Sequence, residues 1–459
     1  MSPTATLKPK HCQVIIVGGG VAGITLALAF ERLEIDYVLF EAHTSLAPSE
    51  GASIGLLPNG LRILEQLGVL DEIEQQSVAL QRWRHINGDG TLISCTSALG
   101  HYPSKIGYGG LFLERQKLLE MMAGHLKNKN AIKTSARITS LAEDKDRVTV
   151  VTEDGLTVTA DLVIGADGVR SVVRKHINPW GPDDCMTGNF ACVYGISSPT
   201  PGISEGDCFS VYRQGASILG FTGKGGVVFW FVFEDLGRPW SLSEVPRYSD
   251  ADVDPVCQSV SHLKIDNGII FADIYANRTI ARKVVLEEGM AKTWHSARAV
   301  LVGDAAHKMV PNAAMGANQA MESAVVLVNE LRGVLALSSD NSFHSETLHN
   351  TLAQYAEQRK SRTIQVQQKA AMVCRAQLCH DGPAEAIVKE LPTLTDGDWL
   401  FRGFMGLADA PVLDHIPLTS RGLMYQKAVE SLRKRAIARQ KGGLKISNLD
   451  LFGLTEGIY

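Results

Sequence analysis

Residues 14–30 read VIIVGGGVAGITLALAF, and this stretch decides the fold class. Its first four residues are branched and apolar, as in a strand that is buried on both faces. Gly18, Gly20 and Gly23 follow with the spacing G-x-G-x-x-G, and an apolar helical pattern begins among them. The first glycine permits a tight turn, the second lets the backbone approach a pyrophosphate, and the third lets helix and strand pack closely. The stretch therefore predicts a strand, a turn and a helix that bind a dinucleotide.

A second apolar strand is predicted over residues 37–40, and it ends at Glu41 about twenty residues after the glycines. A carboxylate at this place can accept hydrogen bonds from both ribose hydroxyls of an adenosine. It would repel a 2′-phosphate, so FAD or NAD fits this site better than NADP. An NAD-linked dehydrogenase without flavin, and a glycine-rich turn in a different α/β fold, both stay open on this evidence.

Beyond these strands, the predicted secondary structure changes several times along the chain. Residues 147–152 alternate like one strand of a hairpin whose partner is residues 157–160. From about residue 185 to 290, short strand-like runs are separated by glycine-rich turns, which indicates an antiparallel sheet. A buried strand and a long helix follow. The predicted parts are a first α/β part at 11–184, the sheet at 185–290, a second α/β part at 291–343 and a mostly helical region at 344–459.

Composition excludes several classes of protein. The 459 residues carry 45 basic and 49 acidic side chains, so the net charge is -4 and no strong field favours nucleic acid. None of the eight cysteines forms a C-x-x-C pair, so no metal site is predicted and free thiols in a reducing compartment are expected. No apolar run approaches the ~18–20 residues that span a bilayer, and the first ten residues lack the core of a secretory signal. A cytoplasmic protein is expected, and the basic segment 427–445 leaves peripheral contact with an internal membrane open.

Two further stretches place polar groups after buried strands. In ADLVIGADGVRSVVR, residues 160–174, Asp167 begins a tight turn. In RAVLVGDAAHKMVPNAAMGANQAMESA, residues 298–324, Asp304 ends a strand and can hydrogen-bond a ribityl hydroxyl. Backbone N–H groups near Gly316, Ala317 and Asn318 lie at the predicted start of a helix, and a helix N-terminus stabilises the pyrimidine edge of a flavin, which becomes anionic on reduction.

In their order and separation, these three stretches resemble the marks of the class A flavoprotein monooxygenases, the para-hydroxybenzoate hydroxylase superfamily. The resemblance covers roughly residues 11–340. The stretches GASIGLLPNGLRILEQLG, residues 51–68, and VYGISSPTPG, residues 193–202, are similar to those of fungal FAD-dependent monooxygenases of meroterpenoid, indole-diterpene and prenylated-alkaloid pathways. This resemblance implies a Rossmann-type FAD-binding domain at 11–184 and 291–343, an inserted antiparallel-sheet substrate domain and a helical C-terminal region.

The resemblance also implies an activity. FAD would be the cofactor, NADPH or NADH the co-substrate, and molecular oxygen the oxidant. A flavin C4a-hydroperoxide would then epoxidise or hydroxylate an apolar, prenylated or indole-type secondary metabolite. An aromatic, phenolic hydroxylase of the same superfamily is one alternative. A non-catalytic flavoprotein-like module that binds prenylated ligands is another.

The residues of the expected site follow from the resemblance position by position. It places FAD contacts on Glu41, Gly55, Arg115, Asp304 and Ala317, and it gives Asp167 and Arg174 a part in flavin and nicotinamide docking. Tyr212, in the strand FSVYRQG, is the first catalytic candidate, and Tyr194 is the reserve. Several relatives carry an arginine where this chain has Phe190-Ala191-Cys192, so Arg213 is a further candidate for the acid. The aromatic residues of the run 227–233, Phe229, Trp230, Phe231 and Phe233, are expected to line an apolar pocket.

Overall fold

The stretch at residues 14–30 folds as its sequence predicts. Strand β1 (Lys10–Val17) ends at the glycine turn, and helix α1 (Val21–Arg32) begins after it. Strand β2 (Tyr37–Phe40) then pairs with β1 in parallel. The computed structural model that gives these elements describes residues 10–49, 51, 53–179, 185–266, 268–337 and 343–441.

The first sheet has seven strands, in the order β7-β2-β1-β10-β9-β8 with β18 beside the end of β10. The predicted hairpin at residues 147–160 is confirmed as the antiparallel pair of β9 and the first half of β10. The end of β10 pairs in parallel with β18. Because parallel strands end at one edge of a sheet, β1, β2, β10 and β18 open onto the same crevice. The other strands of this sheet are β7 (Ile132–Lys133), β8 (Ile138–Glu143), β9 (Val148–Thr152), β10 (Thr157–Gly165) and β18 (Ala299–Leu301).

The second sheet has eight strands, in the order β19-β17-β11-β14-β13-β12-β4-β5. The antiparallel sheet expected over residues 185–290 is confirmed as the middle of this larger sheet. β4 and β5 come from the stretch assigned to the first α/β part, and β4 pairs with β12 in parallel. The domain boundaries at residues 184 and 290 stay predictions, although strand pairing crosses them. The strands are β4 (Arg82–Asn87), β5 (Leu92–Thr96), β11 (Met186–Ser197), β12 (Asp207–Tyr212), β13 (Ala216–Thr222), β14 (Val228–Ser241), β17 (Arg278–Met290) and β19 (His307–Lys308).

The two faces of the second sheet have different neighbours, because side chains alternate along a strand. Trp230 packs with α7 (Val253–Ser259) and α8 (Phe271–Ala276) in a core of their own. Leu219 and Phe231 belong to the larger core that continues into the first sheet. The second face therefore looks toward the crevice at the end of β1.

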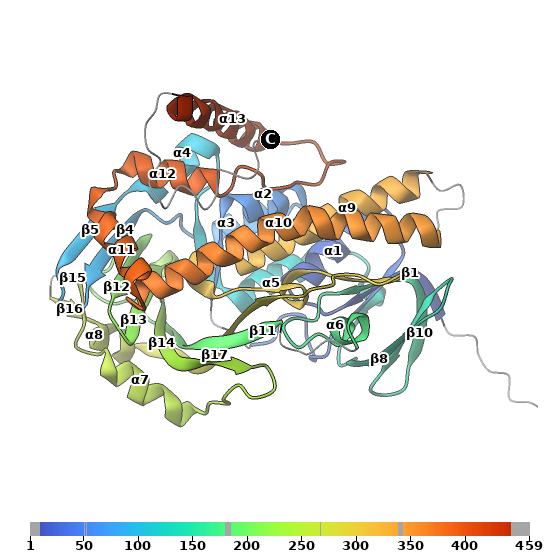
Figure 1. Cartoon of the computed structure of the whole chain (residues 1–459), viewed down its shortest axis with the longest axis horizontal. Helices are drawn as coiled ribbons and strands as arrows, with labels where there is room; N and C mark the ends of the chain where they lie inside the picture. The colour runs from blue at the N-terminus through green and yellow to red at the C-terminus, as the bar shows by residue number, and fades with distance from the viewer. Residues whose placement is uncertain are drawn as a thin grey trace, which may run out of the picture.

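Two long helices run along the molecule, and the second of them reaches the second sheet (Figure 1). Helix α9 (Gly316–Leu337) packs on α1, and helix α10 (Ser345–Gln377) packs on α9 and reaches β12 and β17. At about 1.5 Å per residue, the 33 residues of α10 span about 50 Å. The helical region expected after residue 344 is confirmed for the described residues, and the basic segment 427–445 is described only as far as residue 441. Its other helices are α11 (Gly382–Glu390), α12 (Asp396–Met405) and α13 (Ser420–Lys441).

Two short strand pairs and five short helices complete the fold. Strands β3 (Ser53–Leu56) and β6 (Leu111–Glu114) pair with each other beside the crevice, and β15 (Lys264–Asp266) pairs with β16 (Ile269–Ile270) at the far side of the second sheet. The short helices are α2 (Pro58–Gln66), α3 (Leu70–Gln75), α4 (Tyr102–Ile106), α5 (Arg115–Gly124) and α6 (Val172–Ile177).

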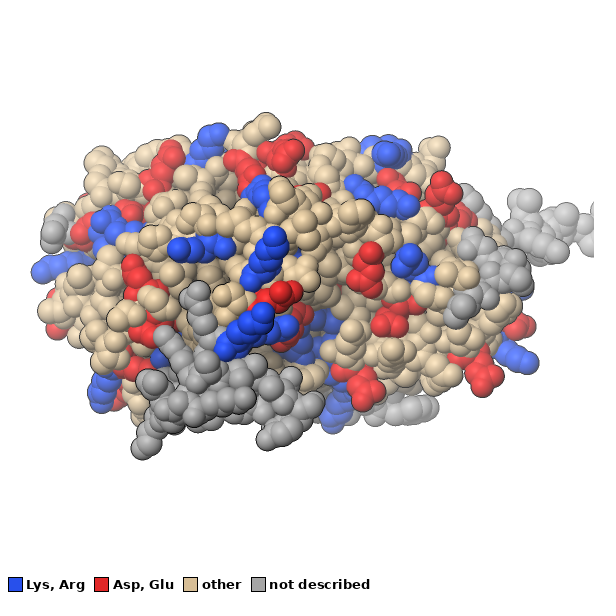
Figure 2. All heavy atoms as spheres, turned by 90° about the horizontal axis from the view of Figure 1, so that it is seen from above, with Lys and Arg blue, Asp and Glu red and all other residues tan. Residues whose placement is uncertain are grey.

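The surface carries charges of both signs. Lys and Arg are interspersed with Asp and Glu over the face shown in Figure 2. Within the described ranges, no helix is both long and apolar enough to cross a membrane. Those same ranges contain no group of three or more His, Cys, Asp or Glu side chains that could hold a metal ion.

Candidate functional site

A cavity of about 590 Å³ lies at the edge where β1, β2 and β10 end. Cofactor and ligand sites usually enclose about 300–1,000 Å³, so its size suits an organic ligand. One end is formed by the glycine turn and by the residues that follow β2. The other end reaches the second sheet at Leu219, Phe221 and Phe231, where Phe112 of the 111–114 strand stacks on Phe221.

The three glycines of the turn meet three different constraints. Gly18 has a φ of +103°, and a Cβ there would lie 2.4 Å from the carbonyl oxygen of Ala166. A Cβ at Gly23 would lie 1.9 Å from the carbonyl oxygen of Gly18, so this glycine lets α1 pack against the turn. A Cβ at Gly20 would meet nothing within 4 Å, and Gly20 lines the cavity. The space in front of Gly20 is therefore the place where phosphates can approach the backbone.

Glu41 lies on the cavity wall and is 9% exposed. Its Oε2 accepts a hydrogen bond from the backbone N–H of Gly19 at 2.6 Å, and its Oε1 accepts one from His43 at 2.7 Å. These bonds fix the carboxylate without using all its lone pairs, because an ionised carboxylate has about four acceptor positions. The arrangement leaves capacity for ribose hydroxyls.

Asp167 presents an acceptor that has no partner among the described residues. Its Oδ2 accepts a hydrogen bond from the backbone N–H of Val172 at 2.8 Å, whereas its buried Oδ1 has none. Burial raises the pKa of this carboxyl group, and hydrogen bonds from Ser171 and Val172 oppose the shift. A buried acceptor on a cavity wall is satisfied when a ligand donates to it, so Asp167 fits a hydroxyl or amide of a bound molecule. Arg174 stands behind this turn and donates to the carbonyl oxygen of Ala305 at 3.0 Å.

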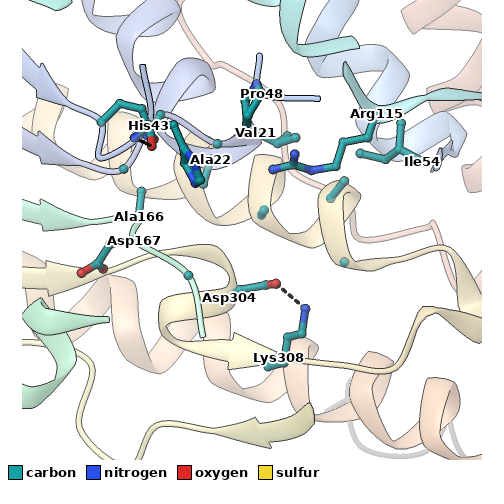
Figure 3. Close-up of a pocket in the computed structure, with 18 of the residues that line it drawn as sticks. Val21, Ala22, His43, Pro48, Ile54, Arg115, Ala166, Asp167, Asp304 and Lys308 are labelled. Atoms are coloured by element: carbon teal, nitrogen blue, oxygen red, sulfur yellow. Dashed lines mark hydrogen bonds and ion pairs between the residues drawn. The ribbon is translucent and has the colours of Figure 1, made fainter. Parts of the chain in front are cut away.

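Asp304 lies across the cavity from Arg115, and it is paired with Lys308 (Figure 3). The Lys308 Nζ donates to Asp304 Oδ2 at 2.7 Å. Burial lowers the pKa of Lys308, but the charges of Asp304 and Glu287 outweigh it and the pKa lies above its ordinary value. Lys308 is therefore a permanent cation on the cavity wall. Sequence reasoning missed this pair, for which the only indication was a lysine four residues after the aspartate.

The start of α9 is held against β3. The Asn318 Nδ2 donates to the carbonyl oxygen of Gly55 at 3.0 Å, and Asn318 Oδ1 accepts from the backbone N–H of Leu57 at 3.1 Å. A Cβ at Gly55 would lie 2.7 Å from the Ala314 side chain, so this strand and the loop before α9 are in close contact. Gly316 and Ala317 line the cavity at the positive end of the helix dipole. Sequence reasoning expected backbone N–H groups near Gly316, Ala317 and Asn318 to face a flavin, but it did not predict the side-chain hydrogen bonds of Asn318.

The structure brings nine of the ten predicted cofactor residues to one cavity. The tenth is Gly23, which packs behind the turn. The nine that line the cavity are Gly18, Gly20, Glu41, Gly55, Arg115, Asp167, Asp304, Gly316 and Ala317. The glycine cradle, the carboxylate after β2 and the unpartnered Asp167 Oδ1 together fit a dinucleotide with a ring system at its far end.

The three catalytic candidates are not among the described residues that line this cavity. The Tyr212 hydroxyl is buried and lies 2.9 Å from His85 Nδ1. Burial raises the pKa of Tyr212 and lowers the pKa of His85 to about 4, so both groups are neutral near pH 7. Tyr194 pairs across the strands with Phe231, which does line the cavity. Arg213 follows β12, and its backbone N–H donates to the carbonyl oxygen of Gln377 at 3.1 Å.

Comparison with known proteins gives a consistent result. The family model described as "FAD binding domain" matches residues 11–370. The FAD-dependent monooxygenase atmM of Aspergillus flavus is 35% identical over 430 residues, which cover 89% of this chain and 88% of the relative. The FAD-dependent monooxygenase penE of Penicillium thymicola is 34% identical over 456 residues, which cover 96% of this chain and 95% of the relative.

Solved structures share the fold at lower identity. The crystal structure of Klebsiella pneumoniae HpxO complexed with FAD and uric acid has a TM-score of 0.72 at 22% identity, and the match covers 87% of this chain and 97% of that one. Pseudomonas aeruginosa PqsL in complex with 2-aminobenzoylacetate has a TM-score of 0.65 at 18% identity, and the match covers 83% and 99% of the two chains.

Proposed function

This chain belongs to the FAD binding domain family and is an FAD-dependent monooxygenase, and on that basis we propose that it adds one oxygen atom to a small apolar molecule. The proposed substrate is a prenylated or indole-containing secondary metabolite, and the proposed reaction is epoxidation or hydroxylation. The observation that carries this proposal is the position of the cavity, which runs from the glycine turn to an aromatic wall on the second sheet.

The cavity offers separate groups for each part of the cofactor. We assign the adenosine ribose to Glu41, the pyrophosphate to the turn at Gly20 and the ribityl chain to Asp304. The first turn of α9 at Ala317 faces the pyrimidine edge in this assignment. When bound, FAD supplies the redox chemistry, since it takes a hydride from NADPH or NADH and activates molecular oxygen.

The aromatic wall has two tasks, which are to hold the substrate and to exclude water. The rings of Phe112 and Phe221 stack at 4.1 Å between centroids, and Phe231 lies edge-on to Phe112 at 6.2 Å. This surface suits an alkene or an aromatic ring. Trp230 was expected in the same wall, but it packs on the opposite face of the sheet because neighbouring residues of a strand alternate.

The proton that the reaction requires has several candidate sources. Tyr212 stays the first candidate, because His85 holds its hydroxyl on the same sheet face as Phe221. Tyr194 occupies this face next to Phe231 and is the second. Arg213 is the third, at the end of the same strand as Tyr212. A Tyr212→Phe variant with full activity would remove the first candidate.

The proposal is tested with the purified holoenzyme, which is expected to be yellow. It is incubated with NADPH or NADH, ¹⁸O₂ and either prenylated indoles or simple phenols, and the products are analysed by mass spectrometry. We expect one labelled oxygen in a prenylated or indole product, together with substrate-dependent oxidation of the nicotinamide. Labelled product from phenols alone would make the chain a phenolic hydroxylase. Bound ligand without any labelled product would indicate a binding module instead.

A further inference from the structure

A charged cluster is buried between α9 and α10, outside the cavity. Glu322 is fully buried and Arg359 is 1% exposed. The Arg359 Nη1 donates to Glu322 Oε2 at 3.1 Å, and the Arg362 Nε donates to the same oxygen at 2.6 Å. The Arg362 Nη2 also donates to Glu322 Oε1 at 2.8 Å. The Glu322 carboxylate therefore accepts hydrogen bonds from two guanidinium groups.

The cluster has an excess of positive charge. Burial raises the pKa of Glu322, but Arg362 and Arg359 outweigh burial and bring the pKa to about 2, so the carboxylate is ionised. Two arginines and one glutamate leave a net charge of +1. The other partners of the cluster are neutral: Asn59, Gln319 and Ser323 are uncharged, and burial lowers the pKa of His307 to about 4.

Among the described residues, the groups that act on the two arginines from beyond these bonded partners do not cancel the charge. Asp409 acts on Arg362 at longer range, but it is exposed and forms its own ion pair with Arg433. Tyr355 is buried and hydrogen-bonded to the carbonyl oxygen of Leu301 at 2.9 Å, and burial raises its pKa. Tyr425 is also buried, and burial raises its pKa to about 12. Both phenols are therefore neutral near pH 7.

The cluster lies directly behind the helix start that faces the cavity. Gly316, Ala317 and Ala320 line the cavity, whereas Gln319 and Glu322 are on the side of α9 that faces α10. The Arg359 Nη2 donates to the side-chain oxygen of Gln319 at 2.8 Å. At about 1.5 Å per residue, Gln319 and Glu322 lie about 5 and 9 Å along the axis from the first residue of the helix. The excess charge therefore adds to the positive end of the helix dipole at the cavity.

A buried charge that has no opposite charge near it destabilises a protein. A negative charge that stabilises the cluster can arise in the cavity, because a flavin becomes anionic on reduction while the oxidised ring is neutral. We propose that the Glu322–Arg359–Arg362 cluster raises the reduction potential of FAD bound in the cavity. This inference rests on the cofactor assignment of the proposed function and is independent of the substrate.

The test compares two variants that change the net charge of the cluster in opposite directions. In Arg359→Gln the cluster loses a positive charge, so the midpoint potential of the bound FAD should fall. In Glu322→Gln it loses a negative charge, so the potential should rise. The interaction between two unit charges about 10 Å apart, at an effective dielectric constant of about 20, changes an equilibrium constant about tenfold. The dissociation constant of sulfite, which adds to oxidised flavin and makes it anionic, should therefore rise about tenfold in the first variant and fall in the second.

Two further variants separate charge from packing. Arg359→Lys keeps the charge and should keep a potential close to that of the natural chain. Arg298→Gln removes another buried arginine, which binds Ser345 Oγ and the carbonyl oxygens of Lys145 and Asp161 at the opposite end of β18. It should lower stability without moving the potential. Potentials that shift in one direction in both Arg359→Gln and Glu322→Gln, or that do not shift, would overturn the inference. A chain that binds no FAD would instead contradict the cofactor assignment.

Discussion

At the scale of single residues, Gly20 and Gly23 are required in the same turn for different reasons, the first for ligand binding and the second for packing. A methyl group at Gly20 meets no atom of the protein, so Gly20→Ala should fold with little change in the free energy of unfolding of the apoprotein. The methyl group would stand in the space assigned to the pyrophosphate, so we expect the dissociation constant of FAD to rise at least tenfold. Fluorescence titration of the apoprotein with FAD measures this.

Gly23→Ala is the matched comparison, because its methyl group would lie 1.9 Å from the carbonyl oxygen of Gly18. This overpacking should cost about 1–3 kcal/mol of stability, measured by urea unfolding of the apoprotein. Equal losses of stability in both variants would contradict the separate roles.

The residues that sequence reasoning found are those whose constraint is local. The glycines and Glu41 are defined by a turn and by the end of one strand, and a spacing of about twenty residues reveals them. Lys308 pairs with Asp304 only because a short turn brings residues four apart together. Arg359 belongs to a helix that begins after the family's marked stretches, so no motif pointed to its contact with Glu322. The polar residues in the apolar helix after Gly316 were the one available indication of a buried network.

At the scale of elements, α9 carries two asparagines with different partners. Asn318 holds the helix start against β3, and Asn329, in the second half of the helix, donates to the carbonyl oxygen of Val412 at 2.9 Å. Asn318→Ala should loosen the cavity wall and raise the dissociation constant of FAD about tenfold. Asn329→Ala should lose about 1 kcal/mol of stability and bind FAD normally. Titration and thermal unfolding of both variants check this, and a larger effect on FAD binding from the second would contradict the assignment.

The hairpin of β4 and β5 shows a part of the fold that the sequence alone does not predict. Burial does not alternate along β4, so the sequence predicts neither this strand nor its partner. β4 pairs with β12 although Trp83 and Cys208 are 125 positions apart in the chain. Only the finished second sheet selects this partner, because it offers an open edge and an apolar face. The strand ends at the crevice were predictable, since parallel strands that follow helices must end together.

At the scale of the whole molecule, two buried neutral histidines make stability depend on pH. Burial lowers the pKa of His85 and of His307 to about 4, against an ordinary value of 6.5. The unfolded chain therefore binds more protons than the folded one between these values, and the free energy of unfolding falls as the pH drops from about 6.5 to about 4. The loss is at most about 3 kcal/mol for each histidine.

Urea unfolding of the natural chain and of His307→Gln between pH 4 and 7 measures this dependence. The variant should lose less stability over that window than the natural chain, even if it is less stable at pH 7. Parallel pH profiles of the two proteins would show that His307 does not titrate as described.

The double pairing of β10 has a consequence for the order in which the protein can be made. Its first half finds β9 within a few residues, but the partner of its second half, β18, is separated from it by five strands of the second sheet, β11, β12, β13, β14 and β17. At translation rates of about 5–20 residues per second, the end of β10 leaves the ribosome roughly 7–27 seconds before the end of β18 does. During that interval its apolar edge is exposed, and Val163 and Ile164 are the residues a chaperone would meet there.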